Sequence, residues 1–138
     1  KKITNLINDK FEVILTTGNK KIESLIDYIS NFETGDNIIF TKTVNGRSVS
    51  YLKNISFDQL ASLVSKSSLL ICCEGAISHL SNNFNVPTLA LYEKKRIQHT
   101  KFWTGHMNKI SLIERKKMTE LLSDENLFNE IKEYLKFI

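Results

Sequence analysis

Proline, glycine and cysteine are scarce in this sequence, which has one, five and two of them in 138 residues. Such scarcity excludes collagen-like chains and low-complexity segments rich in proline and glycine. Long apolar runs are absent as well, and the longest, Leu69 to Cys73, is far below the ~20 residues that a membrane-spanning helix needs. What is present, 41% hydrophobic and 25% charged residues, is typical of a folded globular protein. The length predicts one domain over residues 1–138.

The motifs of several enzyme classes are also missing. The chain contains no G-x-G-x-x-G and no Walker lysine motif, which argues against a nicotinamide dehydrogenase and a P-loop NTPase. It has no Asp-x-Asp and no cluster of His, Cys and carboxylate residues at ligand spacing, so we expect no metal and no cofactor. The two cysteines, Cys72 and Cys73, are adjacent, which is the wrong spacing for a C-x-x-C zinc or redox site. They are predicted to be buried, reduced thiols of a cytoplasmic protein.

The charge is mildly basic. The net charge of +4 arises from 19 basic and 15 acidic residues, and 16 of the basic residues are lysines. Base readout favours arginine and binding to single strands favours aromatic platforms, but the arginines are only Arg47, Arg96 and Arg115. The composition therefore predicts no nucleic-acid partner. A phosphate-bearing small molecule and an anionic membrane surface fit the basic excess equally well.

Hydrophobic periodicity predicts alternating strands and helices. Strands are expected at 11–16, 38–40, 69–73, 88–92 and 109–113, and helices at 22–29, 57–64, 76–84 and 123–135. The run at 69–73 is apolar without alternation, which is typical of a central parallel strand covered on both faces. Residues 45–48 are predicted to form a hairpin or loop, and 93–108 a basic loop. This order predicts an α/β fold, a Rossmann-like open and mostly parallel sheet with helices on both faces.

Ligands of open parallel sheets bind beyond the carboxyl ends of the strands, where helix N-termini offer unpaired amides. Gly75 is the most informative residue of this kind, because a small residue directly after a strand would let an anion approach the next helix. The candidates at this junction are Glu74, Gly75, Ala76, Ser78 and His79. The candidates at two other junctions are Gly18, Glu93, Lys94, Lys95 and Arg96. A tight turn at Gly75, a packed His79 and a solvated basic loop stay open as alternatives.

A longer pattern surrounds this junction between Ile55 and Tyr92. It consists of Leu60-Ala61-Ser62-Leu63, the apolar strand, Glu74-Gly75-Ala76-Ile77-Ser78-His79 and Val86-Pro87. The pattern resembles the C-terminal half of glycosyltransferase family 9, the ADP-heptose:lipopolysaccharide heptosyltransferase group with a two-domain GT-B fold. In that family an acidic residue, Thr or Ser, Gly, two further residues and His follow the strand. Glu74 and His79 take the acidic and histidine positions, Gly75 stands at the hydroxyl position and Ala76 at the glycine position.

The resemblance implies a donor-binding domain in lipopolysaccharide biosynthesis. The junction at Glu74 to His79 would hold the diphosphate of a nucleotide-diphosphate sugar, with Gly18 and 93–96 near its phosphates or ribose. The catalytic base and the glycan or lipid-linked acceptor would belong to an N-terminal domain, so no catalytic residue is expected here and the fragment alone should be inactive. The start at Lys1-Lys2, with no initiator Met and no signal peptide, fits the C-terminal half of a longer protein. The expected location is the cytoplasm, with peripheral association at the inner face of the membrane left open.

Two other interpretations fit the same sequence. A non-catalytic module, either a degenerate transferase half or a flavodoxin-like interaction domain, would use the basic loop to bind a partner. Saturable binding of nucleotide diphosphates would distinguish a donor-binding domain from such a module. Another GT-B enzyme, such as a sugar-nucleotide epimerase, would share the sheet but should place more carboxylates and histidines around the cleft.

Overall fold

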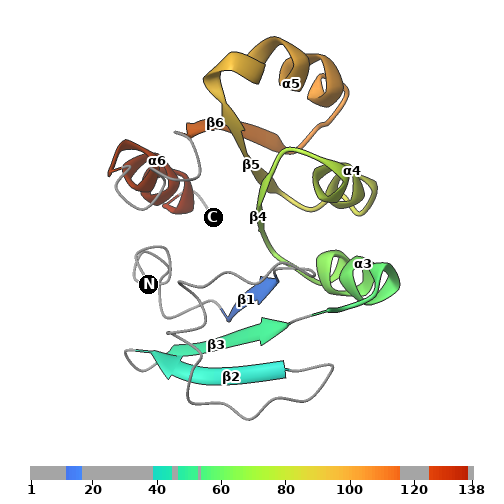
Figure 1. Ribbon diagram of the computed structural model, residues 1–138, viewed down its shortest axis with the longest axis vertical. Coiled ribbons are helices and arrows are strands. Elements are labelled where there is room, and N and C mark those ends of the chain that lie inside the picture. Colours follow the sequence, from blue (N-terminus) through green and yellow to red (C-terminus); the bar gives the residue numbers. More distant parts are fainter. Residues whose placement is uncertain (1–11, 17–38, 45–46, 53, 116–124, 137–138) are drawn as a thin grey trace. The chain divides into compact units, whose positions relative to one another are not determined.

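The computed structural model describes residues 12–16, 39–44, 47–52, 54–115 and 125–136 (Figure 1). The elements are β1 (Val13–Thr16), β2 (Ile39–Val44), β3 (Arg47–Leu52), α3 (Phe57–Ser65), β4 (Leu70–Cys73), α4 (Ala76–Asn83), β5 (Thr88–Glu93), η1 (Lys94–Arg96), α5 (Ile97–Thr104), β6 (Ile110–Arg115) and α6 (Glu125–Leu135). The chain divides into two compact units, Lys1–Gln59 and Leu60–Ile138, and each is described by itself. The helix expected at 22–29 and the candidate Gly18 lie outside the described residues.

The first unit contains a three-stranded sheet in the order β1-β3-β2. β1 pairs in parallel with β3, whereas β2 and β3 pair antiparallel, with Val44 opposite Arg47. Only two residues separate these strands, Asn45 and Gly46, so the pairing supports the hairpin interpretation of 45–48. The strand β3 itself was not predicted. The alternation of Ser48 and Ser50 with Val49 and Tyr51 is a strand pattern that the turn signal before it obscured.

The start of α3 is capped by Ser56 and Gln59. The Ser56 amide donates to Gln59 Oε1 at 2.8 Å, and the Gln59 amide donates to Ser56 Oγ at 3.2 Å. These reciprocal bonds form a capping box, which satisfies two amides that the helix itself cannot pair.

The second unit contains a three-stranded parallel sheet in the order β4-β5-β6. β5 is its middle strand, and Thr88, Leu89, Ala90 and Leu91 at its start are all buried. The prediction that 69–73 is the central strand was therefore wrong for the described sheet, because β4 lies at its edge. The expectation that both cysteines are buried fails for the same reason: Cys72 is half-buried, and Cys73, at the end of this edge strand, is exposed. Neither forms a disulfide.

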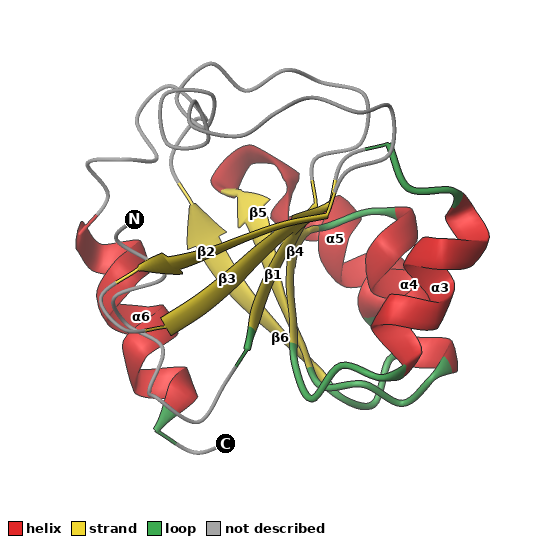
Figure 2. Cartoon of the chain, turned by 90° about the horizontal axis from the view of Figure 1, so that it is seen from below, coloured by secondary structure: helices red, strands yellow, loops and turns green. Residues whose placement is uncertain are grey.

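Helices cover both faces of this parallel sheet (Figure 2). Leu89 and Leu91 of β5 pack with Ile113 of β6 and Ile131 of α6 in one buried cluster. The side chain of Thr88 points to the opposite face of the sheet and contacts Ser81 of α4. Because side chains alternate along a strand, α6 covers one face while α4 and α5 cover the other. This α/β, Rossmann-like arrangement with mostly parallel pairing confirms the predicted fold class and is consistent with one half of a GT-B fold.

The end of α4 is closed by a Schellman motif. Asn85 has a φ of 57°, the Val86 amide donates to the Ser81 carbonyl at 2.9 Å, and the Asn85 amide donates to the Asn82 carbonyl at 3.0 Å. This motif ends a helix through one residue in the left-handed conformation. It directs the chain through Pro87 into β5.

The stretch predicted as a basic loop contains the helix α5. The prediction of a loop at 93–108 was wrong because α5 has no apolar stripe to reveal it. Its fully or nearly fully buried residues are Thr100 and Thr104, and the Thr104 hydroxyl donates back to the Thr100 carbonyl at 2.8 Å. Phe102 and Trp103, in contrast, are exposed. Apolar periodicity does not predict a helix that buries threonines and exposes aromatic side chains.

Candidate functional site

The turn between β4 and α4 is built around Gly75. Its φ of 155° and ψ of −162° lie in a region that side-chain-bearing residues rarely adopt. A Cβ placed on Gly75 would meet no atom within 4 Å. The backbone conformation therefore favours glycine here, although packing does not demand it, and the space beside its Cα is open.

Ser78 closes this turn from inside the helix. Its hydroxyl donates to the Gly75 carbonyl at 2.7 Å, and its oxygen accepts from the Gly75 amide at 3.3 Å. Ser78 is completely buried, so in this structure its hydroxyl shapes the turn and is not presented to solvent.

The first four backbone amides of α4 differ in whether they have a hydrogen-bond acceptor among the described residues. The amides of Ser78 and His79 donate to the Gly75 carbonyl at 3.0 and 3.5 Å. The amides of Ala76 and Ile77, the first two residues of the helix, have no acceptor among the described residues. They lie at the end of the helix that carries a partial positive charge.

The carboxylate of Glu74 is held by α5. Its Oε2 accepts a 3.0 Å hydrogen bond from the hydroxyl of Thr100, and its Oε1 lies 3.9 Å from Nδ1 of His99. The Glu74 side chain is only 12% exposed and Thr100 is completely buried. Glu74 therefore fixes the β4–α4 turn to α5.

Trp103 forms a hydrogen bond to Nε2, the other ring nitrogen of His99. Its indole Nε1 donates to His99 Nε2 at 2.9 Å, with the rings tilted by 55°. His99 is exposed, with 55% of its side chain accessible, and it joins Trp103 to Glu74.

His79 contacts a different histidine. Its ring stacks on that of His106, with the ring centroids 5.7 Å apart and the planes 24° from parallel. His79 is half-buried and His106 exposed. This contact was not predicted, because His106 follows the unpredicted helix α5.

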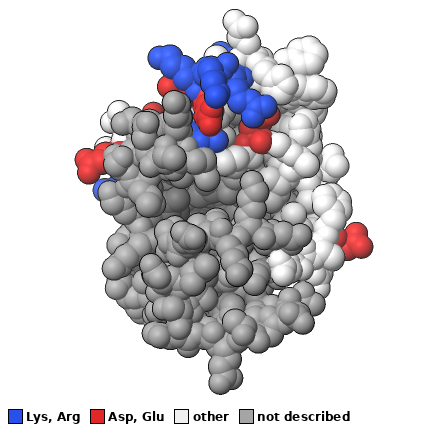
Figure 3. All heavy atoms as spheres, viewed as in Figure 1, with Lys and Arg blue, Asp and Glu red and all other residues white. Residues whose placement is uncertain are grey.

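In the basic segment Lys94–Arg96, Lys95 forms an ion pair with Glu93. Figure 3 shows basic and acidic side chains gathered together on one face. Lys95 Nζ lies 3.2 Å from Glu93 Oε2, and Arg115 Nη1 lies 3.4 Å from Glu93 Oε1. The hydrogen bond from Lys95 holds the pKa of Glu93 below its ordinary value, and the charges of Lys95 and Arg115 act in the same direction. Part of the charge of this segment is thus already balanced within the protein.

The predicted residues meet at one end of the sheet but divide between its two faces. Glu74 follows β4 and contacts α5. Glu93 and Arg115 pair across β5 and β6, and each lies two residues beyond Leu91 or Ile113, whose side chains pack toward α6. Alternation along a strand therefore places Glu93 and Arg115 on the α6 face. The ion pair at Glu93 and the Gly75 turn are separate features of the same carboxyl edge.

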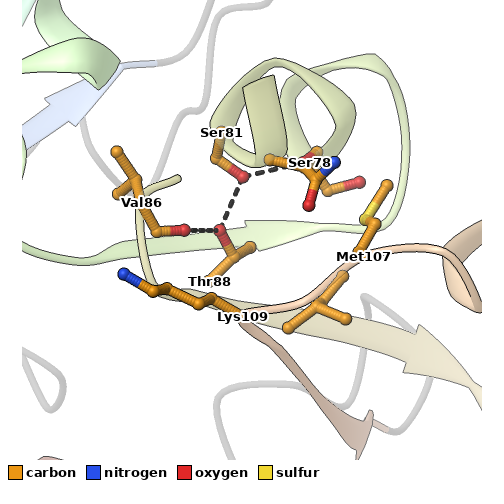
Figure 4. A pocket seen from close by; sticks show the side chains of 8 residues that line it. Ser78, Ser81, Val86, Thr88, Met107 and Lys109 are labelled. Atoms are coloured by element: carbon orange, nitrogen blue, oxygen red, sulfur yellow. Dashed lines mark hydrogen bonds between the residues drawn. The ribbon is translucent and has the colours of Figure 1, made fainter. Parts of the chain in front are cut away.

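A small hollow lined by both polar and apolar side chains lies at the opposite end of this sheet (Figure 4). The hydroxyls of Ser81 and Thr88 lie 2.5 Å apart at its floor, and each also contacts a backbone carbonyl, of Ser78 and Val86 respectively. The hollow has no room for a water molecule. The hollow is a closely packed contact between α4 and β5. The Gly75 turn is therefore the stronger candidate for ligand binding.

Neither a metal cluster nor a membrane helix is found in the part of the chain that the structure describes. No three His, Cys, Asp or Glu side chains there gather closely enough to hold a metal ion. Among the described helices, none is long and apolar enough to cross a bilayer.

A comparison with protein families matches residues 3–129 to Glycosyltransferase family 9 (heptosyltransferase). The chain belongs to glycosyltransferase family 9. The match confirms the family suggested by the pattern between Ile55 and Tyr92, and it extends far beyond that pattern in both directions. Comparisons of this family 9 chain with curated proteins and with solved structures found no match.

Four residues of this carboxyl edge were missed from the sequence. His99, Thr100 and Trp103 lie on α5, whose helical pattern was hidden, and Arg115 ends β6. Arg115 alone had a usable signal, because a cation shortly after a predicted strand at 109–113 falls at the edge where ligands bind.

Proposed function

We propose that this chain is the donor-binding domain of a family 9 glycosyltransferase. It would bind a nucleotide-diphosphate sugar for transfer of a glycosyl group to lipopolysaccharide or another cell-surface glycan. The observation that carries this proposal is the Gly75 turn, where the space beside the Gly75 Cα is open and the amides of Ala76 and Ile77 have no acceptor among the described residues. Family membership supplies the reaction class.

A diphosphate suits this turn physically. Its oxygens can accept hydrogen bonds from both amides, and the partial positive charge of the helix end stabilises the added negative charge. Gly75 leaves room beside its Cα for a phosphate to approach. Fixed amide donors of this kind stabilise a departing diphosphate without reorganising during the reaction.

The other predicted residues take narrower roles in the proposal. Ser78 shapes the turn through its bonds to Gly75, and His79 stands one turn into the helix. The exposed residues Lys94, Lys95 and Arg96 add positive charge at the end of β5. Glu93 is paired with Lys95 and Arg115, which makes it a weaker candidate for a ribose contact than the sequence suggested.

The catalytic base and the acceptor site belong to another domain in this proposal. The 138-residue chain alone is therefore expected to transfer no sugar. A heptose donor is the first choice because the matched family is described as heptosyltransferase. The proposed location is the cytoplasm, at the inner face of the membrane where a lipid-linked acceptor would be met.

The test is a titration of the chain with ADP, UDP, GDP and CDP, followed by calorimetry and by backbone amide shifts. The expected result is saturable binding of at least one diphosphate, with the largest shifts at Gly75, Ala76 and Ile77. Binding confined to Lys94–Arg96 would instead place the ligand on the basic segment and refute the proposed site.

A non-catalytic module is the second candidate. It is favoured by one observation, namely that Gly75 and Ala76 stand where the family pattern has a hydroxyl residue and a glycine. The two candidates differ in the titration, because a module that has lost the donor site would bind none of the four nucleotides.

A further inference from the structure

His99 belongs to a connected group of side chains beside the Gly75 turn. The group, called here the His99 group, consists of Glu74, His99, Thr100 and Trp103. Thr100 donates to one oxygen of Glu74, His99 faces the other, and Trp103 donates to His99. Glu74 immediately precedes Gly75, so this group adjoins the proposed diphosphate site through the backbone.

The hydrogen bond from Trp103 determines which ring nitrogen of a neutral His99 carries the proton. An indole N–H can only donate, so His99 Nε2 must be the acceptor of the 2.9 Å bond from Trp103. The proton of the neutral ring is then on Nδ1, which faces Glu74 Oε1 at 3.9 Å. That distance is one of ion-pair contact and is too long for a hydrogen bond.

Glu74 is the charged group that contacts His99 among the described residues. The histidine of α4 and the histidine that follows α5, His79 and His106, stack on each other. On the preceding segment, Lys95 is paired with Glu93. Glu74 Oε1 therefore lies within ion-pair distance of Nδ1 of His99.

We propose that His99 is a further donor-binding residue, an inference that rests on the proposed function. When the diphosphate binds, the hydrogen bond from Trp103 to Nε2 breaks and the indole N–H turns to solvent. Nε2 takes a proton from solvent and donates it in a hydrogen bond to a phosphate oxygen. The imidazolium is stabilised by Glu74, which Thr100 holds in place, and it offsets the charge of the leaving diphosphate.

The first test is calorimetry of ADP and of inorganic pyrophosphate in two buffers of different ionisation enthalpy. The parent chain should take up a proton on binding. His99→Gln should bind about tenfold more weakly, as expected when a hydrogen bond between charged groups is lost, and without proton uptake. Trp103→Phe should bind about two- to tenfold more tightly, because a competing donor is removed from Nε2. Lys101→Gln, which removes a charge from an exposed position of the same helix, should change affinity less than twofold.

The second test uses the fluorescence of Trp103, which is the single tryptophan of the sequence. ADP should change its emission in the parent and leave it unchanged in His99→Gln. Weaker binding by Trp103→Phe would show instead that the indole stacks on the base, and it would overturn the proposal, as would equal affinity and proton uptake in parent and His99→Gln. Shifts at Ala76 and Ile77 in that case would leave the proposed function standing. Failure of every nucleotide to bind would overturn both.

Discussion

The Ser78 hydroxyl and the Gly75 carbonyl are joined by a 2.7 Å hydrogen bond in which the hydroxyl donates. The same oxygen accepts from the Gly75 amide at 3.3 Å, so one buried side chain fixes both polar groups of the residue that turns the chain into α4. These two hydrogen bonds hold the turn that precedes Ala76 and Ile77, whose backbone amides are the proposed ligand contacts.

Replacement of Ser78 by alanine should therefore loosen the turn. It removes a capping interaction from a buried position and should lower the free energy of unfolding by about 1–2 kcal/mol. Urea denaturation measures this loss. The matched control is Ser62→Ala on the exposed side of α3, for which a change within about 0.5 kcal/mol is expected. Equal effects of the two substitutions would contradict the role given to Ser78.

Gly75→Ala tests whether the backbone conformation of the turn or the packing around it requires glycine at this position. The φ of 155° should cost an alanine about 1–3 kcal/mol of stability, even though its Cβ would meet no atom within 4 Å. The expected result is a lower urea midpoint with an unchanged m value, since the surface buried on folding stays the same. An alanine variant as stable as the parent would show that the backbone at this position is not strained.

The sequence predicted the Gly75 turn and most of the parallel sheet because their signals are local. An apolar run, a glycine after it and the spacing of Ala76, Ile77 and Leu80 are visible without any tertiary contact. The contacts of Glu74 were not predictable in this way, since Thr100 and His99 are twenty-five or more positions away and lie on a helix that buries threonines. The edge position of β4 in the described sheet was not predictable either, because an apolar run does not reveal how many neighbouring strands it has.

Glu93 should make stability depend on pH in the acid range. Its pKa is held below the ordinary value of 4.5 by Lys95 and Arg115, so the ionised carboxylate favours the folded state. This contribution is fully present above the unfolded pKa and is lost as the pH falls through the lower, folded value. The difference in unfolding free energy between the parent and Glu93→Gln should thus be constant near neutrality and shrink below pH 4.5. A difference that does not vary between pH 7 and 3 would contradict the ion pairs.

The two cysteines should react at different rates. Burial raises the pKa of Cys72 to about 12, with Cys73 adding to the effect, whereas Cys73 is exposed. Because the thiolate is the reactive form, a disulfide reagent at pH 8 should modify one thiol quickly and the other slowly. Cys73→Ser should remove the fast phase and Cys72→Ser the slow one. A fast phase that survives in Cys73→Ser would show that Cys72 is accessible.

The central claim, that the first amides of α4 hold the donor's diphosphate, is tested most directly by ADP binding to Ala76→Pro and Ala76→Gly. Ala76 is the first residue of the helix, where proline fits the backbone and removes only the N–H. Glycine keeps that N–H and matches the family pattern. Calorimetry should find Ala76→Pro folded but weaker by about tenfold, the expected loss of one hydrogen bond to a charged group, with Ala76→Gly binding as well as the parent. If folded Ala76→Pro binds ADP like the parent, the amides of this turn do not hold the diphosphate and the account is wrong.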